Sequence, residues 1–418
     1  MPFVRALHQL RDQLTEISSD APGALQLRAC LAGEVDALAW LAAQRCWPQF
    51  YWQARSGQST LMALGALDIC RSMDQATTRL HALPPTWQLA GANAVDGDSY
   101  LFLPILSLRQ DDSGQWLSLN LLSDTSLYQE ARRLLAWLDG LLPSQLLPPL
   151  PHAISVNTLP DKPGWCRQVE RALQAIRAGE LDKVVLARAS DFTCVQPLSA
   201  AALLAASQQI NPRCYHFMLA TAEDRALAGS SPERLYARQG TELWSEALAG
   251  TADIAEAGLL GDGKNQWENQ LVVEDIRQRL AGEVTALDVA AAELLPLRHL
   301  QHLRRRIHAT LRHSDDARCV SRLQPSAAVY GLPRRAAAAF IHQHQSFQRG
   351  WYSGSIGYLS LHHSEFAVVL RCAEVRGNQA RLYAGAGIVS GSDAQREWQE
   401  VEHKSATLGC LFSGENPA

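Results

Sequence analysis

The chain has 418 residues, enough for one large domain or for two to three ordinary ones. Hydrophobic residues make up 47% of it and charged residues 19%, which is a globular composition with ample material for a core. The 38 Lys and Arg nearly balance the 42 Asp and Glu, and the formal net charge of −4 excludes a general electrostatic attraction to nucleic acid or to an anionic membrane.

The N-terminus and the cysteines bear on the cellular compartment. Arg5, His8, Arg11 and Asp12 interrupt the apolar side chains of residues 1–14, so no signal peptide is expected. No apolar run approaches the roughly 20 residues that span a bilayer. The nine cysteines form no CxxC pair, and their odd number is typical of free or buried thiols in a reducing compartment. The sequence therefore predicts a cytoplasmic protein.

Strands and helices alternate in the first third of the chain. Its patterns predict four strands and one helix, over residues 50–55, 59–65, 100–109, 116–122 and, for the helix, 126–138. The segment DDSG between the third and fourth strands is a hairpin signal. Residues 142–163 contain six prolines and are the best candidate for a linker. They would separate an N-terminal portion, residues 1–150, from a second region, residues 164–413.

The second region begins with a predicted helix, from Trp165 to a stop at Gly179. Further helices are predicted over residues 267–280 and 298–311, and strands over residues 183–189, 352–361, 366–376 and 379–389. Short connections join the last three strands, so these must be antiparallel neighbours. Ser392 is predicted to open a final helix, with Gln395 completing a capping box. The expected fold class is α+β with antiparallel sheets, not a doubly wound α/β fold.

Two glycine-rich segments resemble nucleotide-binding motifs. Residues 258–265 (GLLGDGKN) nearly match the phosphate-binding loop GxxxxGK[ST], but Asn265 replaces the metal-binding hydroxyl and no strand is predicted before the loop. Residues 385–391 (GAGIVSG) have the first two glycines of a dinucleotide fingerprint, but the third is one residue late and the segment ends an antiparallel meander. Nucleotide binding is a minor alternative, and the glycines of the second segment are expected to let backbone amides approach a ligand.

Arg371 stands among small apolar residues of a predicted strand, on the same face as Ala367, Val369 and Ala373. A buried guanidinium needs an anionic partner, because an unpaired buried charge is costly. The partner can be a protein carboxylate, or a substrate carboxylate held by two parallel hydrogen bonds. The pattern favours neither.

Acidic residues on two predicted helices admit two interpretations. Glu397, Glu400 and Lys404 share a face of the last helix, and by itself this predicts a solvated stripe with a Glu400–Lys404 pair. Glu268 precedes the apolar residues of an earlier helix, and two converging carboxylates would suit Mg²⁺. Three consecutive arginines, residues 304–306, are expected on a solvated helix and not in a nucleic-acid patch.

A set of motifs in fixed order resembles the chorismate-utilising enzymes, which include isochorismate, salicylate, anthranilate and aminodeoxychorismate synthases. The motifs are residues 182–188 (DKVVLAR), 231–235 (SPERL), 248–251 (LAGT), 324–334 (QPSAAVYGLPR), 352–354 (YSG), 370–371 (LR) and 383–388 (YAGAGI). Segments 300–305 (LQHLRR), 357–361 (GYLSL) and 397–400 (EWQE) are most similar to isochorismate synthases of the menaquinone pathway. The resemblance implies two antiparallel sheets packed between helical layers, as in the large subunit of anthranilate synthase, with residues 1–150 part of the same fold.

The resemblance also implies catalytic and metal-binding roles. Lys183 corresponds to the base that activates water for attack at C2 of chorismate, and Glu233 to the acid that protonates the departing C4 hydroxyl. Glu268 and Glu400 correspond to the ligands of Mg²⁺, which holds the ring carboxylate, and Glu397 to a residue that reaches the metal through water. A buried carboxyl keeps its proton, as an acid must, and desolvation lowers the pKa of a lysine, as a base requires.

Other positions correspond to substrate contacts. Tyr352, Arg371 and the backbone of Gly387 match contacts with the enolpyruvyl carboxylate. Mg²⁺ and a guanidinium would supply the positive charge that the chorismate dianion needs. The site region also includes the matching positions Gly250, Thr251, His302, Ala328 and Lys404.

Departures within the family indicate the chemistry. Aminodeoxychorismate synthases have a lysine where Ala249 stands, and anthranilate synthases, which use ammonia, lack a lysine at the position of Lys183. Water is therefore the expected nucleophile. Salicylate-forming relatives usually have threonine where Ala328 stands, so the reaction is expected to stop at isochorismate. The loop at residues 253–264 is shorter than in many relatives.

The sequence thus predicts a Mg²⁺-dependent isochorismate synthase of menaquinone biosynthesis. A salicylate synthase, or an isochorismate synthase of a siderophore pathway, is the alternative within the family, and an NTPase built on the GLLGDGKN loop is the alternative outside it. Chorismate is the expected small-molecule partner. No nucleic acid, membrane or glutaminase subunit is expected, and the protein is predicted to be a monomer.

Overall fold

The computed structural model describes residues 2–413. Its α-helices are α1 (Pro2–Thr15), α2 (Ala37–Ala43), α3 (Met73–His81), α4 (Leu127–Asp139), α5 (Lys162–Arg177), α6 (Ala200–Ile210), α7 (Gly263–Leu280), α8 (Asp316–Leu323), α9 (Arg334–His344) and α10 (Ala394–Gly409). The two 3-10 turns are η1 (Leu259–Gly261) and η2 (Cys410–Phe412). None of the helices in the described range is both long and apolar enough to cross a membrane.

The strands of the first half are β1 (Gly23–Cys30), β2 (Gln49–Gln53), β3 (Thr60–Cys70), β4 (Gln88–Asn93), β5 (Ser99–Asp111), β6 (Gly114–Ser123), β7 (Ala153–Leu159), β8 (Lys183–Cys194), β9 (Tyr215–Ala222) and β10 (Arg225–Ser231). Those of the second half are β11 (Arg234–Gln239), β12 (Glu242–Asp253), β13 (Val284–Val289), β14 (Glu293–Pro296), β15 (Leu300–Leu311), β16 (Gly331–Leu332), β17 (Ser355–Ser360), β18 (His363–Val368), β19 (Cys372–Arg376) and β20 (Gln379–Ile388).

The strands form two antiparallel sheets that diverge at β5. One sheet runs from β1 through β6, β5, β3, β2, β9, β10, β19 and β20 to β8, which also pairs with β7 and β16. The other runs from β5 through β4, β17, β18, β11 and β12 to β15, which also pairs with β13 and β14. The divergence is possible because one end of β5, residues 99–102, pairs with β4, while residues 101–110 pair with β3.

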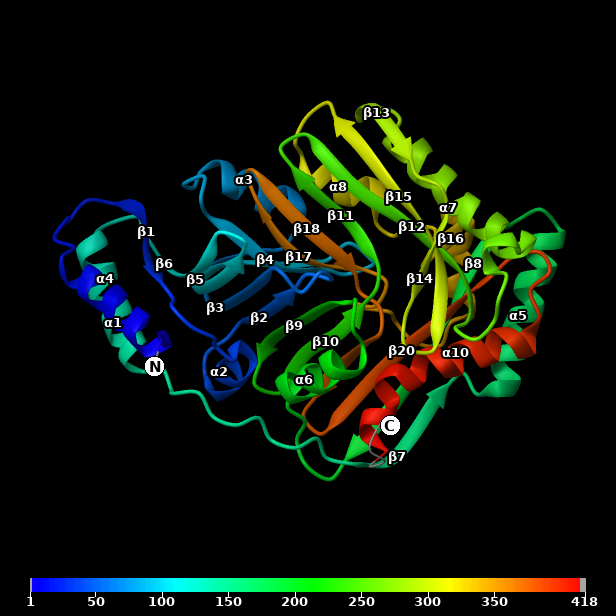
Figure 1. Ribbon diagram of the computed structural model, residues 1–418, viewed down its shortest axis with the longest axis horizontal. Helices are drawn as coiled ribbons and strands as arrows, with labels where there is room; N and C mark the ends of the chain where they lie inside the picture. Colours follow the sequence, from blue (N-terminus) through cyan, green and yellow to red (C-terminus); the bar gives the residue numbers. More distant parts are fainter. Residues whose placement is uncertain (1, 414–418) are drawn as a thin grey trace.

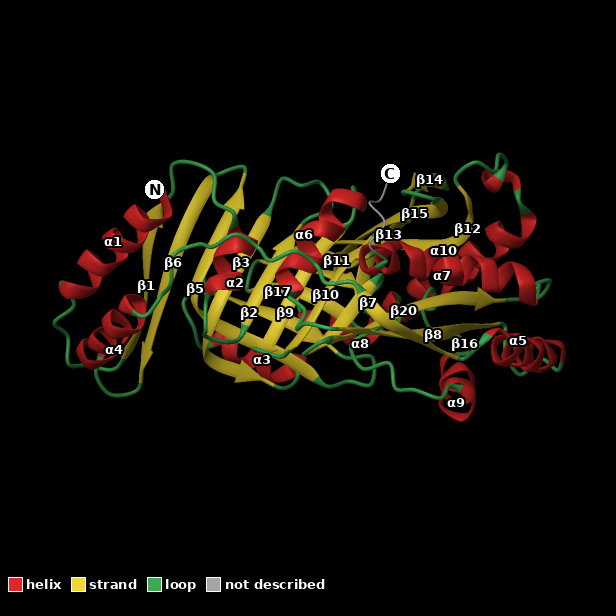
Figure 2. Ribbon diagram, turned by 90° about the horizontal axis from the view of Figure 1, so that it is seen from below, coloured by secondary structure: helices red, strands yellow, loops and turns green. Residues whose placement is uncertain are grey.

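A hydrophobic core fills the space between the two sheets. It joins Phe50 and Phe217 of the first sheet to Ile356 and Ala367 of the second, all fully buried. Helices α1, α2, α4 and α6 pack on the first sheet, α5, α9 and α10 on β8 and β20, and α3, α7 and α8 on the second sheet. In Figure 1, α1 and α4 lie at one end of the molecule and α5 at the other, and Figure 2 shows helices on both sides of the strands. The predicted α+β class, with packed antiparallel sheets between helices, is confirmed.

Most predicted elements are present. The two hairpins of the first third are β2–β3 and β5–β6, and the helix after them is α4. Residues 141–152 have no regular structure, but β7 lies inside the predicted linker and pairs with β8. Strand β2 pairs with β9, and β4 pairs with β17, so hydrogen bonds join the first 150 residues to the rest of the chain.

The helix predicted over residues 298–311 is wrong, because this segment forms strand β15. Its residues Ile307, Ala309 and Leu311 alternate on the buried face, which is the period of a strand. Pairing with β12 on one side and with β13 and β14 on the other decides the conformation. The three arginines therefore lie on a strand, where Arg304 and Arg306 both pair with Glu293.

Two further predictions are corrected in the C-terminal quarter. The strand predicted over residues 366–376 is divided into β18 and β19, and Arg371 lies in the break with a φ of 45°. Arg371 consequently does not share a strand face with its neighbours, although it is buried as expected. The N-cap of α10 is Asp393, whose side chain accepts hydrogen bonds from the backbone N–H groups of Gln395 and Arg396. The Ser392 hydroxyl instead accepts from the N–H of Val389.

Candidate active site

One pocket contains most of the residues that the sequence singled out. Eleven of the twelve predicted site residues line it: Glu233, Gly250, Thr251, Glu268, His302, Ala328, Tyr352, Arg371, Gly387, Glu400 and Lys404. Leu248 and Ala249 of β12 and Ala384 and Gly385 of β20 complete much of the wall. The twelfth, Lys183, is fully buried just behind the wall. Segments far apart in the sequence are therefore brought together here by the pairing of the two sheets.

Lys183 opens β8 and points toward Glu268 of α7. Its Nζ lies 2.8 Å from Glu268 Oε1, with 0% of the lysine side chain exposed. Although burial opposes ionisation of the carboxyl, the nearby Lys183, Lys264 and Lys404 lower the pKa of Glu268. A Cβ atom placed on Gly387 would stand 2.5 Å from Glu268 Oε1 and 2.9 Å from Lys183 Cε. A larger residue at this position of β20 would displace the Glu268–Lys183 pair.

Glu233 lies between β10 and β11, at the point where the chain leaves one sheet for the other. It is 3% exposed. Burial, and then the negative charge of Glu246, raise the pKa of Glu233 to about 8, while Lys183 and Lys404 act in the opposite direction. At neutral pH the side chain is therefore mostly a neutral carboxylic acid that has a proton to donate.

Carboxylates gather on the α7–α10 side of the site. Three of them are paired with lysines, as Glu268–Lys183 (2.8 Å), Glu397–Lys264 (2.8 Å) and Glu400–Lys404 (2.6 Å). Burial and the negative charge of Glu400 raise the pKa of Glu397, because the carboxylates of Glu397 and Glu400 repel each other. A cation would relieve that repulsion.

These carboxylates fit a Mg²⁺ ion whose remaining ligands are water and substrate oxygens. Among residues 2–413 no group of three or more His, Cys, Asp or Glu side chains is arranged to hold a metal unaided. Mg²⁺ favours one or two protein carboxylates completed by water and substrate oxygens. Glu268 and Glu400, which both line the pocket, provide such a pair, and the buried Glu397 lies one helical turn before Glu400.

A hydrogen-bonded chain of three side chains orients Arg371. The guanidinium donates to His302 Nε2 at 3.0 Å, and His302 Nδ1 lies 3.0 Å from Thr251 Oγ1. Burial, followed by the charges of Arg371 and Lys404, holds the pKa of His302 well below its usual range. Histidine is therefore neutral and can accept from the guanidinium. No carboxylate in the described range forms an ion pair with Arg371, which favours a substrate anion as its partner.

The remaining predicted residues shape the pocket. Tyr352 stacks on Tyr383 with ring centroids 5.0 Å apart, and burial raises its pKa to about 12, so the hydroxyl keeps its proton. Lys404 Nζ donates to the carbonyl of Gly385 at 2.9 Å. Gly250 has a φ of 85° and lies where the register of β12 against β15 shifts, a conformation that glycine adopts at little cost.

Several residues that were not among the predicted site residues support the pocket. Arg349 is buried and donates to the carbonyls of Val329, which lies beside Ala328, and of Val185 on β8. Lys264, within the GLLGDGKN segment, pairs with Glu397, and the side chain of Asn265 accepts from the N–H of Thr251. The position of Arg349 three residues before Tyr352 is the one signal that could have drawn attention to it.

Comparison with known proteins places the chain in a family. Residues 93–411 match the chorismate binding enzyme family. The isochorismate synthase MenF of Escherichia coli is 45% identical, over 97% of this chain and 98% of that protein. The isochorismate synthase MenF of Haemophilus influenzae is 37% identical, over 99% and 97%.

Comparison with solved structures supports the same family. That of the menaquinone-specific isochorismate synthase MenF from Escherichia coli is similar with a TM-score of 0.95 and 43% identity, over 99% of this chain and 100% of that one. Component I of anthranilate synthase from Streptococcus pneumoniae has a TM-score of 0.68 at 19% identity, over 91% and 94%, and shares the fold. The family predicted from the sequence motifs is confirmed: this chain belongs to the chorismate binding enzymes.

Proposed function

We propose that this protein is an isochorismate synthase, an isomerase that converts chorismate to isochorismate. One observation carries the proposal: a buried glutamic acid with a pKa of about 8 lines the pocket, and a buried lysine lies directly behind its wall. The relatives of highest identity described above are named isochorismate synthases and align with nearly the whole chain. The activity predicted from the sequence agrees with them.

Lys183 and Glu233 divide the proton transfers between them. Lys183 takes a proton from water as the water oxygen attacks C2 of chorismate. The ring double bonds shift, and the C4 hydroxyl departs with the proton that Glu233 gives. One water is added and one is lost, so the net reaction is an isomerisation. A general base and a general acid must lie within hydrogen-bond reach of C2 and C4. Glu233 lines the pocket and Lys183 lies directly behind its wall, which supports this assignment.

Arg371, Tyr352 and the backbone at Gly387 would hold the enolpyruvyl carboxylate. The guanidinium is fixed by His302 and lies in the same pocket as both other groups. Bound Mg²⁺ would supply the positive charge that the ring carboxylate needs, with Glu268 and Glu400 as its protein ligands.

Small residues favour water as the nucleophile and isochorismate as the end product. Ala249 lines the pocket where family members that form aminodeoxychorismate have a lysine. Ala328 also lines it, and a methyl group cannot make the hydrogen bond that a threonine would offer to the intermediate. This disfavours a salicylate synthase, which is the second candidate function. An NTPase has less support, because Lys264 of the GLLGDGKN segment pairs with Glu397.

The wider assignment is also part of the proposal. We place the enzyme in menaquinone biosynthesis and not in a siderophore pathway, since the two most similar relatives described above are both named MenF. We expect a cytoplasmic monomer that needs no glutaminase subunit, because water replaces ammonia as the nucleophile. Residues 164–413 would form the chorismate-binding region, with residues 1–150 completing the same fold.

The decisive experiment is product identification. The protein is incubated with chorismate and Mg²⁺, the products are identified by mass spectrometry and NMR, and pyruvate is followed with lactate dehydrogenase. Isochorismate with little pyruvate is expected near neutral pH. Pyruvate release in step with chorismate consumption would replace the proposal by a salicylate synthase. ATP-dependent thermal stabilisation without chorismate turnover would favour the NTPase.

A further inference from the structure

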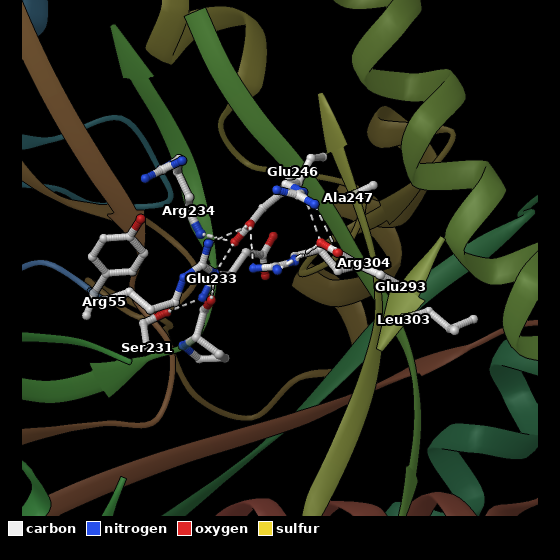
Figure 3. Close-up of polar contacts among 12 residues, drawn as sticks. Arg55, Ser231, Glu233, Arg234, Glu246, Ala247, Glu293, Leu303 and Arg304 are labelled. Atoms are coloured by element: carbon white, nitrogen blue, oxygen red, sulfur yellow. Dashed lines mark hydrogen bonds and ion pairs between the residues drawn. The ribbon is translucent and has the colours of Figure 1, made fainter. Parts of the chain in front are cut away.

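A buried ion pair lies directly beside the segment that carries Glu233 (Figure 3). Arg55 Nη1 donates to Glu246 Oε1 at 2.8 Å, and Arg55 Nη2 donates to Glu246 Oε2 at 3.0 Å. The two side chains are only 15% and 2% exposed. A bidentate pair of this kind fixes both partners in one geometry. Neither residue lines the pocket.

The pair holds the main chain on both sides of Glu233. Arg55 Nη1 also donates to the carbonyl of Pro232 at 2.7 Å, and Glu246 Oε1 also accepts from the N–H of Arg234 at 2.7 Å. The carbonyl of Glu233 itself accepts from the N–H of Val368 at 3.0 Å. The peptide groups before and after Glu233 are therefore anchored to one rigid pair of side chains.

We propose that Arg55 and Glu246 are positioning residues for the reaction, which set both the place and the protonation of the catalytic acid Glu233. This inference rests on the proposed function of Glu233. It assigns a part in the chemistry to Arg55, which follows β2 in the N-terminal portion of the chain. Glu246 is supplied by β12 of the other sheet.

The charges around Glu233 give the pair an electrostatic role that packing alone would not have. Lys183 of β8 and Lys404 of α10 favour the ionised carboxylate, whereas Glu246 of β12 favours the protonated acid. Tyr352 is neutral at the working pH, because its pKa is about 12. Burial raises the pKa of Glu233 the most, and the charge of Glu246 raises it further. Arg55 balances the charge of Glu246, so the two residues must act in opposite directions on the acid.

Two substitutions use this opposition. Glu246→Gln keeps an oxygen that can accept the Arg234 N–H but removes the negative charge, so Glu233 should lose its proton at lower pH. The alkaline limb of kcat against pH should then move down by about one pH unit. Arg55→Gln removes the nearer of the two guanidinium partners of Glu246 and leaves only Arg304 at 3.8 Å, so less of the negative charge is balanced and the limb should move up. Both variants should lower kcat at neutral pH, because each loosens one side of the anchored segment.

Glu293→Gln is the matched control. Glu293 belongs to the same network through Arg304, which lies 3.8 Å from Glu246, but it is 33% exposed and contacts neither Arg55 nor the segment of Glu233. The alkaline limb of kcat against pH for Glu293→Gln should coincide with that of the unmodified protein. The proposal would be overturned if neither the Glu246 variant nor the Arg55 variant shifted the alkaline limb. It would also be overturned if both variants shifted the limb in the same direction. If Glu246→Gln does not fold, Arg55→Lys and Arg55→Gln decide, because only the second should move the limb.

A measurement without turnover separates this inference from the proposed function. The C=O stretch of the Glu233 carboxylic acid is followed by infrared difference spectroscopy as pH is varied, with Glu233→Gln as the reference. The titration midpoint should be lower in Glu246→Gln than in the unmodified protein, and higher in Arg55→Gln. Failure to consume chorismate would reject the proposed function, but the predicted order of the three titration midpoints could still be tested. An unchanged midpoint in an active enzyme would reject the inference alone.

Discussion

Replacing Glu233 by glutamine should abolish the acid while relieving the fold of an unfavourable group. A carboxyl with a pKa of about 8 is about nine-tenths protonated at pH 7, whereas one with the ordinary value of 4.5 would be protonated in roughly one molecule in 300. The environment of Glu233 therefore makes it a usable acid at neutral pH. Glutamine has a similar shape but cannot give up a proton to the C4 hydroxyl, so kcat should fall by roughly 10²–10⁴.

The same pKa shift has a thermodynamic consequence. The folded protein retains a proton on Glu233 that the unfolded chain releases above pH 4.5. Each pH unit above that value costs about 1.36 kcal/mol until the folded-state pKa is reached, so at pH 7 the folded state is disfavoured by roughly 3 kcal/mol. Glu233→Gln removes this cost. The variant should be more stable than the unmodified protein at pH 7, with a difference that disappears toward pH 4.5.

Two assays check this reasoning. Initial rates of the unmodified enzyme should fall about tenfold between pH 7 and pH 9 as Glu233 ionises. Thermal unfolding, followed by circular dichroism at several pH values, should give the variant the higher midpoint at neutral pH. A flat rate profile to about pH 10 would contradict the assignment of Glu233 as acid. A variant destabilised equally at pH 4.5 and pH 7 would show that Glu233 is not held protonated in the fold.

Further outcomes are expected at other positions. Lys183→Ala should lower kcat by roughly 10²–10⁴ in a folded protein, and a near-normal rate of isochorismate formation would remove the lysine from the mechanism. EDTA should abolish turnover and Mg²⁺ should restore it, and full activity in metal-free buffer would contradict the metal requirement. Glu268→Gln or Glu400→Gln should weaken the binding of both metal and chorismate in calorimetric titrations. Ala328→Thr should raise the share of pyruvate and salicylate, detected by coupled assay and fluorescence, without abolishing isochorismate formation.

Several features of the fold could be predicted from the sequence because they depend on local chemistry. The turn at DDSG, the two strands over residues 50–55 and 59–65, the helix α4 and the C-terminal meander follow from turn residues and hydrophobic period. The helix predicted over residues 298–311 was wrong because strand pairing on both sides of β15 overrides the helical preference of its arginines and leucines. The break at Arg371 has no local signal, since a positive φ at arginine is imposed by the surrounding structure.

By itself the sequence determined the family and the identities of the residues in the candidate site, because the motifs keep their order and their chemically required residue types. The glycines of the GAGIVSG segment were expected to let backbone amides approach a ligand, and Gly387 lines the pocket. Only the tertiary structure decided that Lys183 meets Glu268, that His302 orients Arg371, and that Arg55 and Glu246 anchor the segment of Glu233. These contacts join residues up to 191 positions apart. Such long-range contacts depend on how two sheets diverge at β5 and pack together, and no pattern in a single segment of sequence encodes that arrangement.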